Sequence, residues 1–263
     1  IPEFRLPKAV VRREIEALQA LGVRFFTNWV GGRTVMVQEL LDQGYGAVFI
    51  GIGAGLPVFL GIPGENRIGV FSANEFLTRV NLGRAYAFPD WDTPVYPARR
   101  VVVFGAGNVA LDAARTAVRL GAQAVSIVYR RSENEMPARA EEIRHAREEG
   151  VAFLCLHAPT AFGGDALGRL ASVRLQRMRL GEPDASGRCR PVACEGAFCE
   201  IEADMAIVAV GTRANPLLPR STPGLQVNRR GYISVTEATG ETTLPMVFAG
   251  GDIVTGAATV ILA

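Results

Sequence analysis

The feature that most constrains the fold is the segment RRVVVFGAGNVA, which runs from Arg99 to Ala110. A short run of β-branched and aromatic residues leads directly into a glycine-rich turn, and an amphipathic helical pattern follows as far as Gly121. A strand, a glycine turn and a helix in this order open a βαβ unit that binds a dinucleotide. A glycine turn also joins strands to helices for packing alone, so the prediction depends on the pattern that flanks it.

Each residue of the turn has a predicted role at a pyrophosphate. Gly105 permits the tight turn, and Gly107 has no Cβ, so the backbone can approach the phosphates. Asn108 and Val109 open the helix, where free N–H groups hold the anion. Ala110 is small enough for the helix to pack closely on the strand. The turn therefore predicts a nucleotide site.

The end of the next predicted strand indicates which nucleotide binds. This strand, AVSIVYRR, begins about 20 residues after the first glycine and ends in Arg130 and Arg131. An NAD site commonly has an acidic residue here, whereas paired guanidiniums suit a 2′-phosphate. The pair therefore predicts NADPH, with a solvated basic strand end as the alternative. Glu133 and Glu135 could compete, but they fall in the loop that precedes Pro137.

Composition excludes several classes of protein. The 263 residues are 49% hydrophobic and carry a net charge of +2, and basic residues are spread among acids, so nothing indicates a nucleic-acid partner. The most apolar window, residues 47–63, is interrupted by glycines and is too short for a membrane helix. The cysteines suggest no disulfide framework, which favours a cytoplasmic location.

The residues that most often carry catalysis or bind metals are isolated. His145 and His157 have no evident triad partner. The spacing of the cysteines matches neither zinc nor iron–sulfur sites and forms no C-x-x-C redox pair; they are Cys155, Cys189, Cys194 and Cys199. We therefore predict no catalytic side chain and no metal site in this chain.

Apolar periodicity predicts the remaining elements. Helices are expected over residues 9–21, 35–41, 73–81 and 138–149. Strands are expected over residues 23–30, 47–50, 151–156, 170–180, 197–201, 205–210 and 246–249. The strand over 170–180 alternates apolar and basic residues, as a half-exposed antiparallel strand does. The proline-rich stretch 89–97 indicates a crossing between domains.

Several longer motifs resemble a known family. They are IPEFRLPK, GIGAGLPVFLGIPGEN, SANEFLTRVN, GAGNVALDAARTA, YRRSENEMPAR, ADMAIVAVGTRANP and FAGGDIVTGAATVI, in this order. Together they resemble the small-subunit type of NADPH-dependent glutamate synthase, one of the two-dinucleotide-binding flavoproteins. Dihydropyrimidine dehydrogenase and the NADPH- and ferredoxin-linked transhydrogenases are relatives, and the sequence separates these types poorly.

The resemblance implies an α/β fold in which a Rossmann-like NADP-binding domain is inserted into a truncated FAD-binding domain. The expected FAD-binding segments are residues 1–95 and 214–263, and the NADPH-binding domain spans residues 96–213. Gly211 would lie at a crossing between the domains, and Gly251 and Asp252 would bind the ribityl part of FAD. Thr259 and Val260, at a helix start, would face the flavin ring.

The resemblance also implies the chemistry and what is missing. NADPH would reduce FAD, and electrons would pass to iron–sulfur centres and a large glutamate synthase subunit or a ferredoxin-type acceptor. The first FAD motif and the cysteines for [4Fe–4S] centres are expected upstream of Ile1, so the segment should keep NADPH recognition and lose most FAD affinity. A regulatory NADPH-binding module and a structural segment with a degenerate site are the alternatives.

Overall fold

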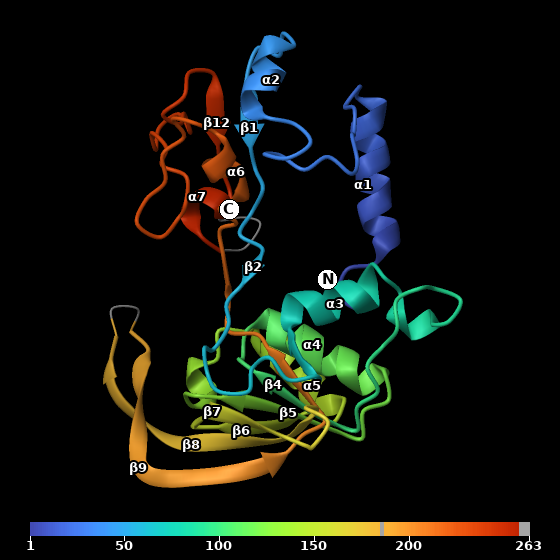
Figure 1. Ribbon diagram of the computed structural model, residues 1–263, viewed down its shortest axis with the longest axis vertical. Helices are drawn as coiled ribbons and strands as arrows, with labels where there is room; N and C mark the ends of the chain where they lie inside the picture. The colour runs from blue at the N-terminus through green and yellow to red at the C-terminus, as the bar shows by residue number, and fades with distance from the viewer. Residues whose placement is uncertain (185–186, 258–263) are drawn as a thin grey trace. The chain divides into compact units, whose positions relative to one another are not determined.

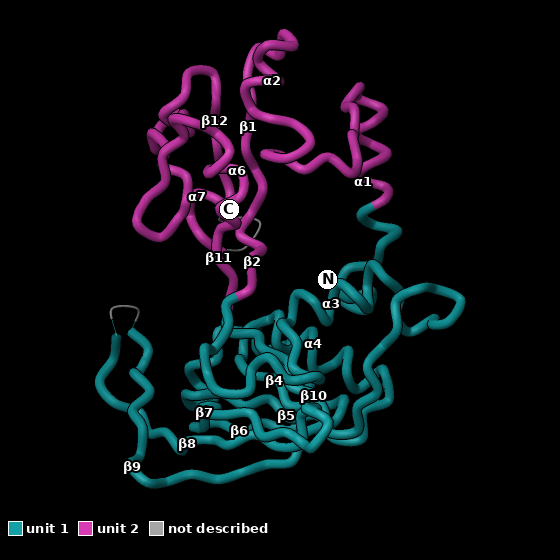
Figure 2. Tube along the Cα trace, viewed as in Figure 1, with its two compact units in different colours: residues 1–11, 58–210 teal, residues 12–57, 211–263 magenta. Residues whose placement is uncertain are grey.

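A computed structural model describes residues 1–184 and 187–257 (Figure 1). The chain forms two compact units (Figure 2). Unit 1 contains residues 1–11 and 58–210, and unit 2 contains residues 12–57 and 211–263. Unit 1 thus extends well beyond the expected nucleotide-binding domain at residues 96–213, because residues 58–95 pack with it.

Unit 1 is built on a parallel five-stranded sheet of order β3-β10-β4-β5-β6. Its strands are β3 (Val70–Ser72), β4 (Arg100–Phe104), β5 (Ala124–Tyr129), β6 (Ala152–Cys155) and β10 (Met205–Val208). Val101 to Phe104 are almost fully buried, as expected for a central parallel strand. The glycine turn therefore follows the middle strand of the sheet, where both neighbouring strands also end.

Helices cover one face of this sheet and a second sheet covers the other (Figure 1). The helices are α3 (Ala73–Asn81), α4 (Asn108–Arg119) and α5 (Ala140–Glu148), and all three were predicted. Val101, Val103 and Ile127 pack against the helices, whereas Val102, Phe104 and Val128 face the second sheet. This alternation follows the two-residue period of a strand. Short 3₁₀ helices η1 (Ala85–Ala87) and η2 (Glu133–Glu135) complete the helical part of unit 1.

The second sheet of unit 1 is antiparallel, with strands β7 (His157–Gly164), β8 (Leu170–Pro183) and β9 (Cys189–Glu202). The prediction of a half-exposed antiparallel strand over 170–180 is confirmed. The strand expected over 197–201 is only the end of β9, which begins at Cys189. Its first half lacks clear apolar alternation and is held by pairing with β8 from Met178 onward.

Unit 2 contains two short pairs of strands and several helices. Strands β1 (Val48–Ile50) and β12 (Val247–Ala249) pair in parallel, and β2 (Leu56–Pro57) pairs antiparallel with β11 (Thr212–Arg213). The helices are α2 (Val37–Asp42), α6 (Leu217–Ser221) and α7 (Asp252–Thr255), and α1 (Lys8–Ala20) begins in unit 1. No described helix is long and apolar enough to cross a bilayer.

One prediction for unit 2 is wrong, and a second is confirmed only in part. The strand expected over residues 23–30 is irregular backbone, and the side chains of Phe25, Phe26 and Trp29 are about half exposed. No described strand pairs with this segment, so its apolar pattern does not produce a strand. The strand expected to be buried over 47–50 forms from Val48, but Phe49 is 70% exposed.

Candidate nucleotide-binding site

The turn between β4 and α4 places a glycine where the backbone allows no side chain. Gly105 has a φ of +122°, and a Cβ at this position would lie 2.3 Å from the carbonyl oxygen of Ala209. The Gly105 N–H donates to the carbonyl of Val128 on β5 at 3.1 Å. The turn is thus fixed between its two neighbouring strands, and only glycine fits there.

Gly107 differs from Gly105, because space is open around it. A Cβ on Gly107 would come no closer to its surroundings than 4.0 Å, from Pro137. Gly107 is the N-cap of α4 and no side chain caps the helix. In the described chain, the N–H groups of Asn108 and Val109 donate to no residue. Unsatisfied donors beside open space at a helix N-terminus form a site for an anion such as a phosphate.

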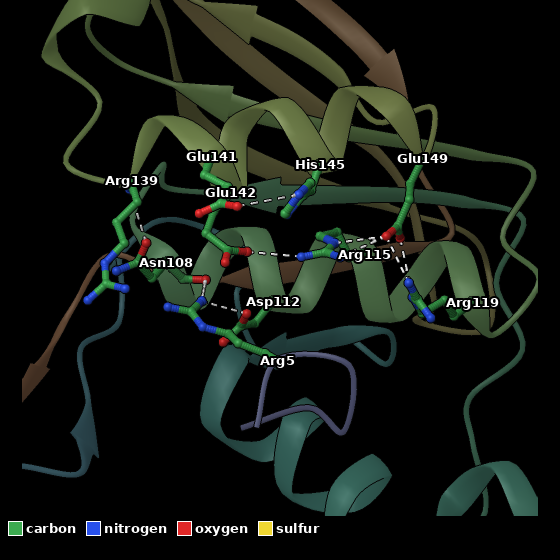
Figure 3. A network of polar contacts seen from close by, with 10 residues as sticks. All are labelled: Arg5, Asn108, Asp112, Arg115, Arg119, Arg139, Glu141, Glu142, His145 and Glu149. Carbon is green, nitrogen blue, oxygen red and sulfur yellow. Dashed lines mark hydrogen bonds and ion pairs between the residues drawn. The ribbon is translucent and has the colours of Figure 1, made fainter. Parts of the chain in front are cut away.

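The other predicted residues of the turn shape this helix start. Ala110 is fully buried against the sheet, and Val109 is 45% exposed. The Asn108 Oδ1 accepts a hydrogen bond at 3.2 Å from the backbone N–H of Arg139, the N-cap of α5 (Figure 3). This bond links the start of α5 to the turn. Sequence reasoning did not select Arg139, although its position after Pro137 in YRRSENEMPAR could have indicated it.

Arg130 and Arg131 follow the carboxyl end of β5, as predicted, but their surroundings differ. Arg130 is exposed, and its guanidinium has no partner among the described residues. The Arg131 side chain is only 8% exposed. Its Nη2 donates to Asp184 at 2.8 Å and its Nε donates to the carbonyl of Cys189 at 2.8 Å. One arginine is therefore available to a ligand, and the other ties the strand end to the β8–β9 hairpin.

The acidic residues of the following loop are engaged within unit 1. The Glu135 carboxylate accepts the backbone N–H of Ser132 at 3.1 Å, which closes a capping box on η2. Glu133 forms an ion pair with Arg147 of α5. These bonds hold both carboxylates within the loop, where they pair with residues of unit 1.

A network of charged groups fixes α4 against its neighbours (Figure 3). The guanidinium of Arg115 bridges Glu142 of α5 and Glu149, the C-cap of that helix, at 2.9 and 2.8 Å, and Arg119 also binds Glu149. Burial tends to raise the pKa of Glu149, but the hydrogen bonds from Arg119 and Arg115 outweigh it and hold that pKa below its ordinary value. The network keeps the helix that presents the anion site in one position.

The predicted flavin residues lie in unit 2, after β12. Gly251 has a φ of +75° and precedes α7, which begins at the half-buried Asp252. Gly211 is exposed, with a φ of +119°, and is the first residue of the second segment of unit 2. Thr259 and Val260 lie outside the described residues. The predicted roles of these residues at FAD stay predictions.

Each histidine lies near an oxygen of a residue close to it in sequence. The Nδ1 of His157 lies 2.8 Å from the carbonyl oxygen of Cys155, and His145 lies 4.0 Å from a carboxylate oxygen of Glu141. Burial raises the pKa of the Cys155 thiol, which makes it a poor nucleophile. Within residues 1–184 and 187–257, no cluster of His, Cys, Asp and Glu has the makings of a metal site.

Comparison with known proteins identifies the family of this chain. The sequence profile of the pyridine nucleotide-disulphide oxidoreductases matches residues 10–263. The chain is 41% identical to the NADP(+)-dependent formate dehydrogenase subunit beta of Moorella thermoacetica, over 99% of this chain and 36% of that protein. It is 37% identical to the glutamate synthase [NADPH] small chain of Halomonas elongata, over 100% of this chain and 56% of that protein. The chain thus spans only part of these relatives.

Solved structures show the same fold. Mycobacterium tuberculosis FprA in complex with NADPH superposes with a TM-score of 0.78 at 23% identity, over 99% of this chain and 69% of that one. The thioredoxin reductase of T. acidophilum gives a TM-score of 0.57 at 20% identity, over 80% of this chain and 58% of that one. The expected fold class and the resemblance to glutamate synthase small subunits are confirmed. The chain belongs to the pyridine nucleotide-disulphide oxidoreductase family.

Proposed function

We propose that this chain is the NADPH-binding part of a flavoprotein oxidoreductase that passes a hydride from NADPH to FAD. The names of its relatives support the nucleotide, since a formate dehydrogenase subunit and a glutamate synthase chain are both designated by NADP(H). NADPH and FAD supply the hydride-transfer chemistry when bound, and the protein supplies binding and orientation.

The observation that supports the proposal most is that the chain has both an open anion site at the start of α4 and an arginine, Arg130, unpaired among the described residues, at the end of the neighbouring strand. The pyrophosphate would lie on the N–H groups of Asn108 and Val109, in the open space at Gly107. Arg130 is exposed at the end of β5, the strand hydrogen-bonded to β4. A dinucleotide that starts on the turn after β4 extends its adenosine ribose toward the end of the adjacent strand. Arg130 would there receive the 2′-phosphate, and its bond to that phosphate selects NADPH.

Arg131 and Arg139 have different roles in this proposal. Arg131 anchors the end of β5 to Asp184 and Cys189, and so fixes the backbone from which Arg130 projects. Arg139 is the N-cap of α5, and its backbone N–H donates to the Oδ1 of Asn108. The side chain of Arg139 is exposed and lies beside the turn (Figure 3). Its positive charge adds to the attraction of the site for phosphate.

The flavin belongs to unit 2 in this proposal. Gly251 and Asp252 would bind the ribityl chain of FAD. Thr259 and Val260 would face the flavin ring. Gly211 would lie where the chain crosses between the two binding domains. Contacts to the adenosine diphosphate half of FAD are expected from residues outside this chain, so the chain alone should bind FAD weakly. An absorbance spectrum after purification tests this. We expect the purified chain to be colourless, and stoichiometric bound flavin would contradict the assignment.

The electron acceptor is a further subunit or domain in this proposal. Relatives are designated as subunits or small chains, among them the NADPH-Fe(3+) oxidoreductase subunit beta of Geobacter sulfurreducens. We infer a partner of the large glutamate synthase subunit type, reached through [4Fe–4S] centres, with a ferredoxin-type protein as the alternative. A cytoplasmic location goes with this assignment.

Titration of the chain into NADPH, followed by nucleotide fluorescence, tests the proposed function. Gly107→Val should abolish binding without unfolding the protein, because the new side chain enters the space of the pyrophosphate and its Cβ comes no closer to the protein than 4.0 Å, from Pro137. Gly46→Val is the matched control, since Gly46 also faces open space but lies in unit 2. Equal NADPH affinity in folded Gly107→Val and unmutated protein would show that the turn is structural only.

A further inference from the structure

The first residues of the chain dock on the helix that carries the anion site. Pro2 is buried, and the ring of Phe4 lies 4.3 Å from the guanidinium carbons of both Arg115 and Arg119. These arginines belong to α4, and residues 1–11 are part of unit 1 although they are remote from α4 in sequence. The segment thus packs along the nucleotide-binding helix.

Arg5 of this segment reaches the first turn of α4. Its Nη1 donates to the Oδ1 of Asp112 at 2.7 Å and lies 3.4 Å from the carbonyl oxygen of Asn108 (Figure 3). The Asp112 side chain is 7% exposed and that of Arg5 is 20% exposed. Asn108 is the first residue of α4, and Asp112 lies one turn further along the helix. The contact therefore lies within one helical turn of the N–H groups that form the predicted pyrophosphate site.

The charge of Asp112 works against an anion at this position. A rise of 1.5 Å per residue places Asp112 about 6 Å along the axis from Asn108. A buried carboxylate at this distance repels a pyrophosphate on the helix N-terminus, because little water screens it. Burial raises the pKa of Asp112, because the charged carboxylate is less stable away from water. The hydrogen bond and charge of Arg5 act in the opposite direction and lower this pKa.

The other cations of the network are already matched. Arg115 pairs with Glu142 and Glu149, and Arg119 pairs with Glu149. Arg5 is thus the cation that forms an ion pair with Asp112 among the described residues. Without Arg5, the Asp112 carboxylate would lose its ion-pair partner and would lie one helical turn from the site.

We propose that Arg5 is a positioning residue of the nucleotide site, which neutralises Asp112 and holds the first turn of α4 so that this turn accepts a pyrophosphate. The proposal rests on the proposed function. It predicts an effect on NADPH and NADH alike, since both nucleotides carry the pyrophosphate and Arg5 lies at the turn rather than at the 2′-phosphate.

The test is a double-mutant cycle with titration calorimetry of NADPH and NADH. Arg5→Met keeps an apolar stem and should weaken the binding of both nucleotides by about tenfold, with their ratio unchanged. Adding Asp112→Asn to Arg5→Met should restore both affinities to within about threefold of the unmutated chain. Arg169→Met is the matched control, because Arg169 pairs with Asp165 in a β-turn away from α4, and should leave both affinities unchanged.

The nucleotide affinities of these variants distinguish failure of the role of Arg5 from failure of the proposed function. Unchanged affinity in Arg5→Met overturns the proposal, and so does a loss that Asp112→Asn does not restore, because docking alone would then explain it. If Arg5→Met does not fold, Asp112→Asn alone decides: the proposal expects binding of both nucleotides at least as tight as in the unmutated chain, and weaker binding overturns it. Failure of the unmutated chain to bind either nucleotide would contradict the proposed function itself.

Discussion

Asp184 holds the guanidinium of Arg131 at 2.8 Å, and this contact separates two arginines that are adjacent in sequence. Arg131 is buried and paired, whereas Arg130 is exposed. Arg130→Ala should therefore weaken NADPH binding by about 1.5–3 kcal/mol and leave NADH binding nearly unchanged, since a charge-assisted bond to the 2′-phosphate is lost. Titration calorimetry with both nucleotides gives the measurement.

Arg131→Ala serves as the comparison for Arg130→Ala. It should lower the free energy of unfolding by about 1–3 kcal/mol, because Asp184 and the Cys189 carbonyl lose their donor. It should not change the ratio of NADPH to NADH affinity. A loss of preference in Arg131→Ala as large as that in Arg130→Ala would show that the buried arginine also meets the 2′-phosphate.

The two glycines of the turn should respond differently to alanine. Gly105→Ala should lower the free energy of unfolding by about 3 kcal/mol, because its Cβ meets the Ala209 carbonyl and its φ is positive. Gly107→Ala should change stability by less than about 1 kcal/mol, because its φ is −84° and its surroundings are open. Urea unfolding of both variants checks this, and equal destabilisation would contradict the turn geometry.

Thr116 on α4 carries a polar atom that the fold leaves unsatisfied. Its Oγ1 is buried and makes no hydrogen bond in the described part of the chain. Thr116→Val, which has the same shape, should leave the free energy of unfolding unchanged or raise it by up to about 1 kcal/mol. Thr222→Val is the control, because the Thr222 hydroxyl donates to the Leu218 carbonyl at 2.8 Å. The control should be destabilised by about 1 kcal/mol, and an equal loss in both variants would refute the assignment.

Asp204 stabilises the start of β4 in a pH-dependent way. Its carboxylate accepts hydrogen bonds from the N–H groups of Arg99 and Arg100 at 3.0 and 2.9 Å. Burial tends to raise its pKa, but these bonds and the Arg100 side chain outweigh it and lower the pKa. A lowered carboxyl pKa contributes stability that is present above the pKa of the unfolded chain, about 3.9, and is lost as the pH falls through the folded pKa.

Asp204→Asn should therefore lower the free energy of unfolding by about 1–2 kcal/mol at pH 7, and the difference should shrink below about pH 4. Urea unfolding at several pH values measures it. Asp90→Asn, an exposed carboxylate, should leave stability nearly unchanged at every pH. A difference that persists at low pH would contradict the assigned role of Asp204.

Local signals in the sequence predicted the parts of the site that local structure determines. The apolar strand before Gly105 and the amphipathic pattern after it are enough to predict the turn and α4. Helix α3 was predicted for the same reason. Its membership of unit 1 was not, because β3 pairs with β10, a strand far along the chain.

Ion pairs between residues far apart in the sequence could not be predicted from sequence patterns. Arg131 is removed from solvent by Asp184, which is 53 positions away, and no local pattern indicates that pairing. The ion pair of Arg5 with Asp112 spans 107 positions. The segment 23–30 shows the converse: its apolar residues alone predicted a strand, but no strand among the described residues pairs with it.

The most direct test of the account is the ratio of NADPH to NADH affinity in the unmutated chain, measured by titration calorimetry at one salt concentration. We expect NADPH to bind at least about tenfold more tightly, because Arg130 is free to pair with the 2′-phosphate, whereas the nearby Glu133 and Glu135 already bind Arg147 and Ser132. Equal affinities, or tighter binding of NADH, would contradict the central claim that this turn and this arginine form an NADPH site.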